Sequence, residues 1–209
     1  MNRLRVLLLA MAFLFIIQFV FTGAFYARLP ETIPTHWNFS GEPDAFGPRS
    51  TVWIMPILSL PLSLLFLGLA WWVGKTEKER FGLLFMGAAT LLFFVVMQIL
   101  VLASCMGYRL DMTRWVGAAI GMLFALIGMG MKDLPRNHLA GIRLPWTMAS
   151  DKAWAVVHQR SSRIMVAGGV AGAILCLLFS GAIGILVSVG SMLWLIVDSY
   201  IVTRPGRLA

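Results

Sequence analysis

The sequence predicts an all-α integral membrane protein with six transmembrane helices. Hydrophobic residues make up 59% of the 209 residues and the mean hydropathy is +0.85, whereas a soluble domain is about 45–50% apolar. The apolar residues gather in runs of membrane-crossing length, and most basic residues gather between alternate runs. Together these patterns exclude an ordinary soluble domain.

The apolar runs give the number of spans. A helix that crosses the hydrocarbon core needs about 20 residues at a rise of about 1.5 Å each. The fifth run is about twice this length, so it has to turn back, and Ser180, Gly181 and Gly184 at its centre permit a tight hairpin. A five-span chain with a broken or tilted last helix is the alternative. The runs are 4–26, 51–73, 81–106, 115–131 and 164–202.

The loops carry Lys and Arg unevenly, which predicts the orientation. Thirteen of the 17 basic residues fall on one side of the six-span topology and four on the other. Because basic loops stay in the cytoplasm, we expect both termini and the loop 132–163 to be cytoplasmic and the loop 28–50 to be external, at a bacterial inner membrane. The excess charge then meets anionic lipid head groups rather than nucleic acid. The thirteen are Arg3, Arg5, Lys75, Lys78, Arg80, Lys132, Arg136, Arg143, Lys152, Arg160, Arg163, Arg204 and Arg207; the four are Arg28, Arg49, Arg109 and Arg114.

Two units are predicted. Residues 1–80 form a pair of helices joined by a proline-rich external loop, and residues 81–209 form four helices with a long cytoplasmic loop.

The loop 28–50 is expected to be ordered, because it holds four of the nine prolines and proline lowers the entropy lost on ordering. The run GEPD at 41–44 is typical of a turn. The aromatic residues Trp37, Phe39 and Phe46 either lie in an interfacial belt or form a lid that an external ligand or peptide contacts.

His36 has Glu31, Glu42 and Asp44 near it in sequence, but no metal site is expected there. The loop holds one imidazole, and its prolines exclude the helix that a metalloprotease motif requires. We expect His36 to satisfy backbone groups within the folded loop. No cofactor is predicted for the chain.

The loop 132–163 contains more prolines, tryptophans, histidines and arginines than a tether needs, so it is expected to fold. Pro135 ends the fourth helix, because proline disfavours helical geometry in its predecessor. Gly141 and Pro145 then shape an irregular connection.

A further helix is expected to begin at Ser150, a candidate N-cap, with Asp151 in its first turn. Spacings of three and four residues place Trp154, Val157 and His158 on one face. This pattern predicts an amphipathic stretch that lies in the membrane interface before the chain enters the bilayer.

Three polar side chains fall inside the apolar runs. An intramembrane ionisable group is a functional candidate by default, but Asp198 lies near the end of its run, where it is expected to be solvated or paired with an arginine. Gln18 and Gln98 are expected to make interhelical hydrogen bonds. A small transporter or channel is an alternative function, although it would need polar groups spread through several spans.

No enzyme is expected, since the chain has no Ser/His/Asp order, paired-carboxylate spacing or phosphate-binding loop. The alternative is a membrane enzyme with a site at the cytoplasmic face, where Asp133, His138, Asp151 and His158 could cluster.

Two stretches resemble a known family. The run NHLAGIRLPWTM at 137–148, followed by Trp154 and His158, is similar to the signature of the SdpI family of bacterial membrane proteins. The run LPETIPTHW at 29–37, with the turn after it, is similar to the small N-terminal domain often joined to SdpI-type proteins.

The resemblance implies toxin immunity, since the family includes a protein that protects against a secreted killing peptide and also holds a transcriptional repressor at the membrane. The chain departs from the family at Leu144, where threonine is usual, and at Val157 and Gln159, where threonine and arginine are usual. The positions that match in place are Asn137, Gly141, Ile142, Arg143, Pro145, Trp146, Thr147, Trp154 and His158. The candidates for toxin contact in the external loop are His36, Trp37, Phe39 and Phe46.

We therefore expect a non-enzymatic immunity or sensor protein whose external loop and helices meet a membrane-active peptide, with Trp37 as a candidate anchor. The element GIRLPWT at 141–147 transmits or stabilises the state. Arg143 is expected to donate to backbone carbonyls of that irregular segment, or to Asp133 or Asp151, because its donors sit in a rigid fork. The expected partners are membrane lipid, a secreted toxin peptide and a cytoplasmic transcriptional repressor.

Overall fold

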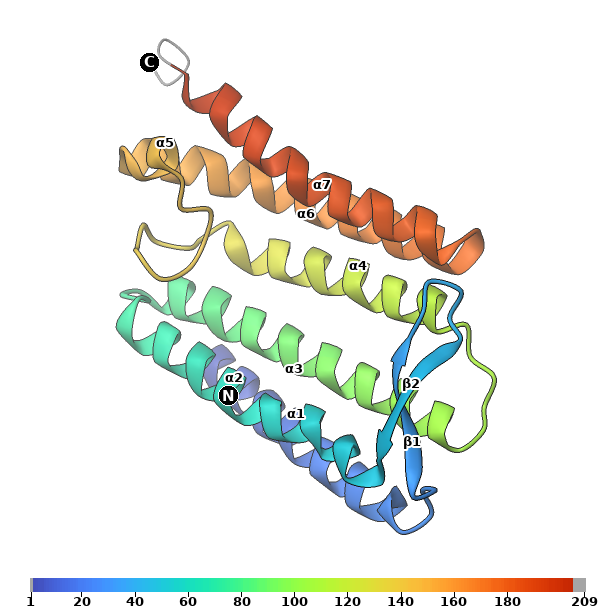
Figure 1. Cartoon of the computed structure of the whole chain (residues 1–209). Coiled ribbons are helices and arrows are strands. Elements are labelled where there is room, and N and C mark those ends of the chain that lie inside the picture. Colours follow the sequence, from blue (N-terminus) through green and yellow to red (C-terminus); the bar gives the residue numbers. More distant parts are fainter. Residues whose placement is uncertain (1, 205–209) are drawn as a thin grey trace.

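The computed structural model describes residues 2–204, so the predicted cytoplasmic Arg207 lies outside the described residues. Within 2–204, six helices are long and apolar enough to cross a membrane, as the sequence predicted (Figure 1). The loop 28–50, expected only to be ordered, adds a β-hairpin to this helical fold. The elements are α1 (Arg3–Tyr26), β1 (Thr32–Trp37), β2 (Pro43–Pro48), the 3-10 helix η1 (Arg49–Trp53), α2 (Ile54–Trp72), α3 (Glu77–Cys105), α4 (Met112–Met131), α5 (Pro145–Met148), α6 (Asp151–Leu178) and α7 (Gly181–Thr203).

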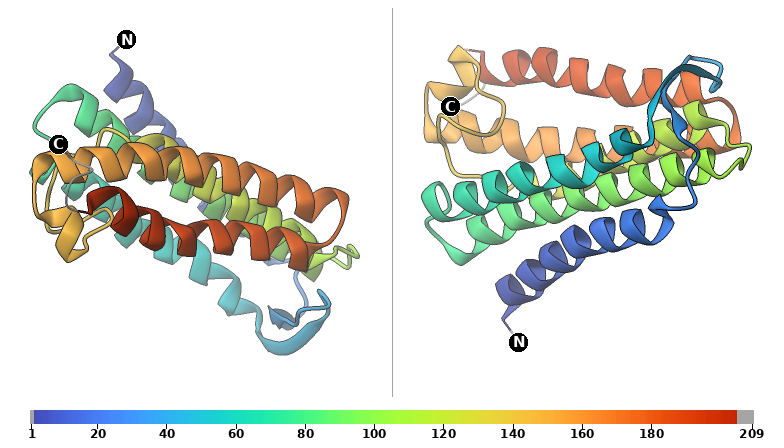
Figure 2. Two further views of the ribbon diagram at one scale, coloured as in Figure 1. Left: turned by 90° about the horizontal axis from the view of Figure 1, so that it is seen from above. Right: turned by 60° about the horizontal axis from the view of Figure 1, so that its bottom comes forward.

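The long helices lie side by side in one bundle (Figures 1 and 2). Helix α3 packs against α1, α2 and α4, while α6 and α7 pack against α4 and against each other. The chain reverses at Phe179 and Ser180, between α6 and α7, which confirms the predicted hairpin in the last apolar run. The division into units 1–80 and 81–209 stays a prediction.

Small residues bring α4, α6 and α7 close together. A Cβ at Gly121 in α4 would lie 2.6 Å from the carbonyl oxygen of Gly169 in α6. A Cβ at Gly181 in α7 would lie 2.7 Å from the carbonyl oxygen of Thr113 in α4. Close backbone approach of this kind is typical of helix association in membranes, where burying apolar side chains gives little advantage over lipid.

Helix α6 is continuous from Asp151 to Leu178, so the predicted amphipathic stretch is the first part of a longer helix, and its position in the membrane interface stays a prediction. The expected N-cap is confirmed, because the Ser150 hydroxyl accepts a hydrogen bond from the Ala153 backbone N–H at 3.0 Å. The face predicted from the spacing exists, but it packs against the protein, where it is buried. Its members are Trp154, Val157 and His158.

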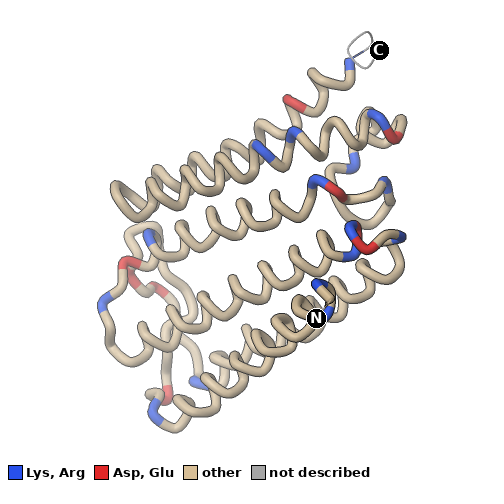
Figure 3. Tube along the Cα trace, turned by 180° about the vertical axis from the view of Figure 1, so that it is seen from behind, with Lys and Arg blue, Asp and Glu red and all other residues tan. Residues whose placement is uncertain are grey.

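The charged residues lie toward the two ends of the bundle (Figure 3). One end carries both described ends of the chain and the segment 132–150, and we call it the basic end. The other carries the β-hairpin and the four remaining arginines, and we call it the hairpin end. The assignment of the basic end to the cytoplasm stays a prediction from this charge distribution.

Candidate functional site

The signature residues of the basic end form a cap, residues 134–158, built around the stacked rings of Trp154 and His158. The ring centroids lie 3.9 Å apart with an interplanar angle of 21°. Gly141 lies against this stack with φ +109°, and a Cβ there would be 2.5 Å from His158 Nε2 and 2.9 Å from the Trp154 ring. Glycine is therefore required twice, for its backbone conformation and for the space it leaves.

His158 holds the cap through both ring nitrogens. The backbone N–H of Ile142 lies 3.1 Å from Nε2, and because an N–H group can only donate, Nε2 accepts. Nδ1 then carries the proton and donates to the carbonyl oxygen of Trp154 at 2.9 Å. The buried imidazole is thus a neutral bridge whose two nitrogens are both occupied.

Thr147 closes the irregular segment into a compact turn. Its buried hydroxyl accepts from the backbone N–H of Leu144 at 2.8 Å and donates to the carbonyl oxygen of Ile142 at 2.6 Å. Pro145 is the first residue of the short helix α5, where the missing N–H group leaves no hydrogen bond unmade.

Asn137 and Arg143 fix the first part of the cap. Asn137 Oδ1 accepts from the backbone N–H groups of Leu139 and Ala140 at 2.8 and 2.7 Å. Arg143 donates through Nη1 to the carbonyl oxygen of His138. The expected bond to a backbone carbonyl is therefore present, although the acceptor lies just before the segment 141–147.

Helix α7 is joined to the cap and to α6 by polar contacts. Trp146 donates its indole N–H to the Ser199 hydroxyl at 3.0 Å and packs edge-on against Tyr200 with ring centroids 5.3 Å apart. Arg160 and Asp198 form a two-pronged ion pair with N–O distances of 2.7 and 3.0 Å. Asp198 was predicted to be either solvated or paired with an arginine, and the structure confirms the pairing.

The four groups considered for an enzyme site do not come together. Asp133 pairs with Lys78 at 2.9 Å and Asp151 pairs with Arg136 at 2.6 Å. His158 is enclosed within the cap, whereas His138 is exposed. The cap is therefore a self-contained structural unit in which nearly every matched side chain already has a partner.

At the hairpin end, β1 and β2 pair antiparallel, with Ile33 opposite Gly47 and an irregularity near His36. The connecting turn contains Gly41 with φ +80°, a conformation that glycine adopts readily. Ile33 is 1% exposed and anchors the hairpin in a small apolar core. The Thr113 hydroxyl of α4 donates to the carbonyl oxygen of Phe39 at 3.0 Å, so the hairpin is held at both of its ends.

His36 pairs with Asp44 across the hairpin, with Nδ1 and Oδ1 2.5 Å apart. The prediction that it satisfies backbone groups is wrong, because strand pairing brings a carboxylate within its reach. Within residues 2–204, no group of three or more His, Cys, Asp or Glu side chains is placed to hold a metal ion.

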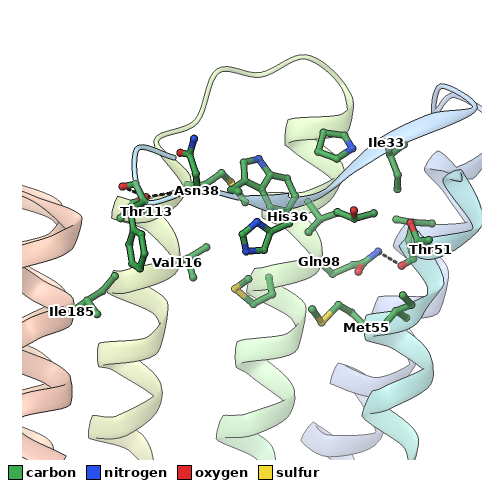
Figure 4. Close-up of a pocket in the computed structure, with 18 residues that line it drawn as sticks. Ile33, His36, Asn38, Thr51, Met55, Gln98, Thr113, Val116 and Ile185 are labelled. Carbon is green, nitrogen blue, oxygen red and sulfur yellow. Dashed lines mark hydrogen bonds between the residues drawn. The ribbon is translucent and has the colours of Figure 1, made fainter. Parts of the chain in front are cut away.

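A pocket of about 500 Å³ lies beneath β1 (Figure 4). The strand forms its roof, and α2, α3, α4 and α7 contribute walls that are mostly apolar and include three methionines. The volume is within the range of ligand pockets, about 300–1,000 Å³. Of the predicted toxin-contact residues, His36, Trp37 and Phe39 line the pocket, while Phe46 lies on the surface, 59% exposed.

Gln98 extends from α3 into the wall of this pocket (Figure 4). Its Nε2 donates to Thr22 Oγ1 at 2.8 Å and to the carbonyl oxygen of Val52 at 3.2 Å, which confirms the predicted interhelical role. Its Oε1 has no hydrogen-bond partner among the described residues. Gln18 donates instead to the carbonyl oxygen of Leu14 in its own helix at 3.2 Å, so the interhelical prediction is wrong for this residue.

Sequence reasoning missed most of the pocket. Met55, Met97, Val116 and Ile185 are ordinary apolar positions within helical runs, and no local pattern marks them. They meet because α3 packs against both α2 and α4, while α4 also contacts α7. The one available signal was Gln98, an amide in an apolar run.

These features define a multi-pass helical protein of the cell membrane. Residues 133–200 match the SdpI/YfhL protein family, and residues 13–60 match a domain of unknown function, DUF1648. The cap lies entirely within the first of these segments and the β-hairpin within the second. Both motif resemblances are thus confirmed as matches to family models over these two segments of the chain.

The chain is also similar to individual proteins. It is 27% identical over 184 residues to "Immunity protein SdpI" of Bacillus subtilis (strain 168), a match that covers 88% of this chain and 87% of that protein. A stretch of 31 residues is 55% identical to an uncharacterized protein of Archaeoglobus fulgidus, which is 15% of this chain and 17% of that protein. No solved structure matches the chain.

Proposed function

We propose that this chain is a membrane immunity protein that protects its cell against a secreted, membrane-active peptide. The main support is the similarity to Immunity protein SdpI, which extends over 88% of the chain and includes both ends of the bundle. A second support is the pocket at the hairpin end, lined by three of the four residues that the sequence singled out for toxin contact.

The hairpin end is proposed to face the outside of the cell. Lys and Arg gather at the opposite end of the bundle (Figure 3), and short basic loops are retained in the cytoplasm. In this orientation a secreted peptide meets the hairpin first. Phe39 is 93% exposed and Phe46 is 59% exposed, so both offer apolar contact area at the membrane surface.

Protection is proposed to work by binding and not by chemistry. Of the four groups considered for an acid–base site, Asp133, Asp151 and His158 are engaged in ion pairs or hydrogen bonds and His138 is exposed, which argues against such a site at the basic end. A transport path is also poorly supported, because Asp198 is paired at the basic end while Gln98 joins α1, η1 and α3 by hydrogen bonds at the hairpin end. The peptide is instead held at the hairpin end, where it cannot assemble in the bilayer.

Signalling is proposed as a second role, carried by the outer surface of the cap. Leu139 is a large apolar side chain that is 59% exposed and lies in the loop rather than on a lipid-facing helix. A cytoplasmic regulator that packs on Leu139 would sense the state of α4, α6 and α7, to which the cap is joined.

The immunity proposal is tested by deleting the gene in its own host and restoring it on a plasmid. Both strains are exposed to cell-free stationary-phase medium of the same species, and survival and membrane depolarisation are measured. We expect the deletion strain to depolarise and die at dilutions of medium that the restored strain survives. Equal survival of the two strains, in medium that kills a sensitive relative, would contradict the proposal.

A further inference from the structure

We propose that the pocket beneath β1 receives a single aromatic side chain of the peptide, of the kind that carries one N–H or O–H donor, as an indole does. This inference depends on the proposed function and deepens it by naming the chemistry that the site recognises. The pocket, at about 500 Å³, has room for a bicyclic ring. Its lining supplies the two kinds of contact that such a ring makes.

The first kind of contact comes from the methionines. Met55 of α2, Met97 of α3 and Met112 of α4 place thioethers around the pocket. Sulfur atoms make favourable contacts with aromatic rings, and the unbranched methionine side chain adapts to the shape of its partner. The ring of Trp37 also lines the pocket, and the imidazole of His36 adds a flat surface beneath the strand (Figure 4).

The second kind of contact is a hydrogen bond to Gln98. The side chain is 1% exposed. The two hydrogen bonds that its Nε2 donates, to the Thr22 hydroxyl and the Val52 carbonyl, fix the orientation of the carboxamide. The oxygen is left without a donor among the described residues, which is unfavourable for a buried acceptor. Gln98 is itself a lining residue and its oxygen is buried, so we infer that a ligand reaches the oxygen when neighbouring methionine side chains shift, as their flexibility allows. A ring with one donor on its edge satisfies this acceptor.

The position of the pocket agrees with such a ligand. Helix α2 packs on α3, while α7 packs on α4 and α6, and the pocket lies between α2 and the pair α4 and α7. Ile54 on its rim is 50% exposed, on a helix that meets lipid. The pocket is thus near the end of the spans, at the depth where tryptophan side chains of membrane-bound peptides reside.

The test measures binding of 5-fluoroindole to the purified full-length protein in lipid nanodiscs by fluorine NMR, with empty nanodiscs to subtract partitioning into lipid. The comparison ligand is 1-methyl-5-fluoroindole, which has the same ring without the donor. Val116→Trp fills the pocket from α4, and Met122→Trp is its matched control, since Met122 is on the same helix, 46% exposed and outside the pocket. Circular dichroism and a melting curve check that each variant folds, and Ile185→Phe replaces Val116→Trp if that variant does not.

We expect saturable binding of 5-fluoroindole to the wild type and to Met122→Trp. The pocket-filling variant should bind at least about tenfold more weakly, because the ring and the new side chain compete for one space. Methylation should weaken binding by about two- to tenfold, the value of one hydrogen bond. Equal binding by Val116→Trp and Met122→Trp would overturn the pocket as the site, and equal affinity for the two ligands would overturn the assignment of Gln98.

The outcome is separable from that of the immunity proposal. If the deletion strain is sensitive and the pocket does not bind the ring, protection is real and its aromatic site lies elsewhere, which overturns this inference alone. If the pocket binds the ring and the deletion strain is as resistant as the restored strain, the proposed function fails while the binding chemistry stands.

Discussion

The backbone N–H of Ile142 donates to Nε2 of His158 across 3.1 Å, and this bond fastens the cap to α6. It also explains the spacing of the signature. Gly141 has to precede Ile142, because a side chain there would strike the imidazole. Trp154 has to lie one helical turn before His158, because its ring stacks on the imidazole and its carbonyl oxygen accepts from Nδ1. The residues of the motif are therefore linked by one set of contacts.

Gly141→Ala is predicted to destabilise the protein. The backbone has φ +109° and the new Cβ would lie 2.5 Å from His158 Nε2; a non-glycine residue in such a conformation costs about 1–3 kcal/mol before the steric clash is added. The measurement is the melting temperature of the purified protein in detergent. Gly107→Ala is the matched control, since Gly107 has φ +87° with nothing within 4 Å of a Cβ. Equal losses at the two positions would contradict the contact with the imidazole.

His158→Phe keeps an aromatic ring on Trp154 but removes both hydrogen bonds. Because the N–H of Ile142 and the carbonyl of Trp154 are then left without partners in a buried setting, we expect a loss of about 1–3 kcal/mol. Nitrogen NMR of the labelled wild-type protein should show a neutral imidazole with the proton on Nδ1. A ring protonated on Nε2 would be incompatible with the bond from Ile142.

Arg160→Leu is predicted to be more destabilising than Asp198→Asn. The first change leaves a carboxylate with 7% side-chain exposure without its partner, whereas the second keeps a neutral group that still accepts from Arg160. The expected loss for Arg160→Leu is about 1–3 kcal/mol, below that of a fully buried pair, because the arginine side chain is 51% exposed. Thermal melting in detergent ranks the two variants, and the reverse order would show that Asp198 does not need the arginine.

The orientation is tested with single cysteines in a background where Cys105 and Cys176 are replaced by serine. Glu42 and Lys152 are both exposed, at the hairpin end and the basic end. In intact cells, Glu42→Cys should react with a membrane-impermeant maleimide, and Lys152→Cys should react only after permeabilisation. The opposite pattern would reverse the assignment of the two ends and with it the proposed path of the peptide.

The sequence predicts the helices well because their signal is local. Each apolar run, the turn at Gly181 and the helix N-cap at Ser150 depend on neighbouring residues, and all three predictions are confirmed. Predictions that depended on residues distant in the sequence were confirmed in one case and wrong in another. Asp198 was expected to find an arginine and did, whereas His36 met a carboxylate across a hairpin that the loop's prolines had not indicated.

The pocket could not be predicted in the same way. Its walls come from four helices whose apolar faces look alike in sequence, since lipid and protein select similar side chains. The predicted contact residues of the cap and of the loop 28–50 lie at opposite ends of the bundle (Figure 1), as the predicted topology requires. Their roles in binding therefore stay predictions, with the hairpin end favoured for the peptide.

The most direct test of the account is the survival of deletion cells that carry Trp37→Ala, compared with cells that carry Trp37→Phe, at matched abundance in the membrane. Trp37 lies in β1 and lines the pocket, and aromatic side chains in such positions often dominate binding energy. We predict that Trp37→Ala lowers the tolerated concentration of toxic medium by about tenfold or more, while Trp37→Phe keeps most of the protection. Full protection by both variants at normal abundance would contradict recognition at the hairpin end and direct attention to the cap.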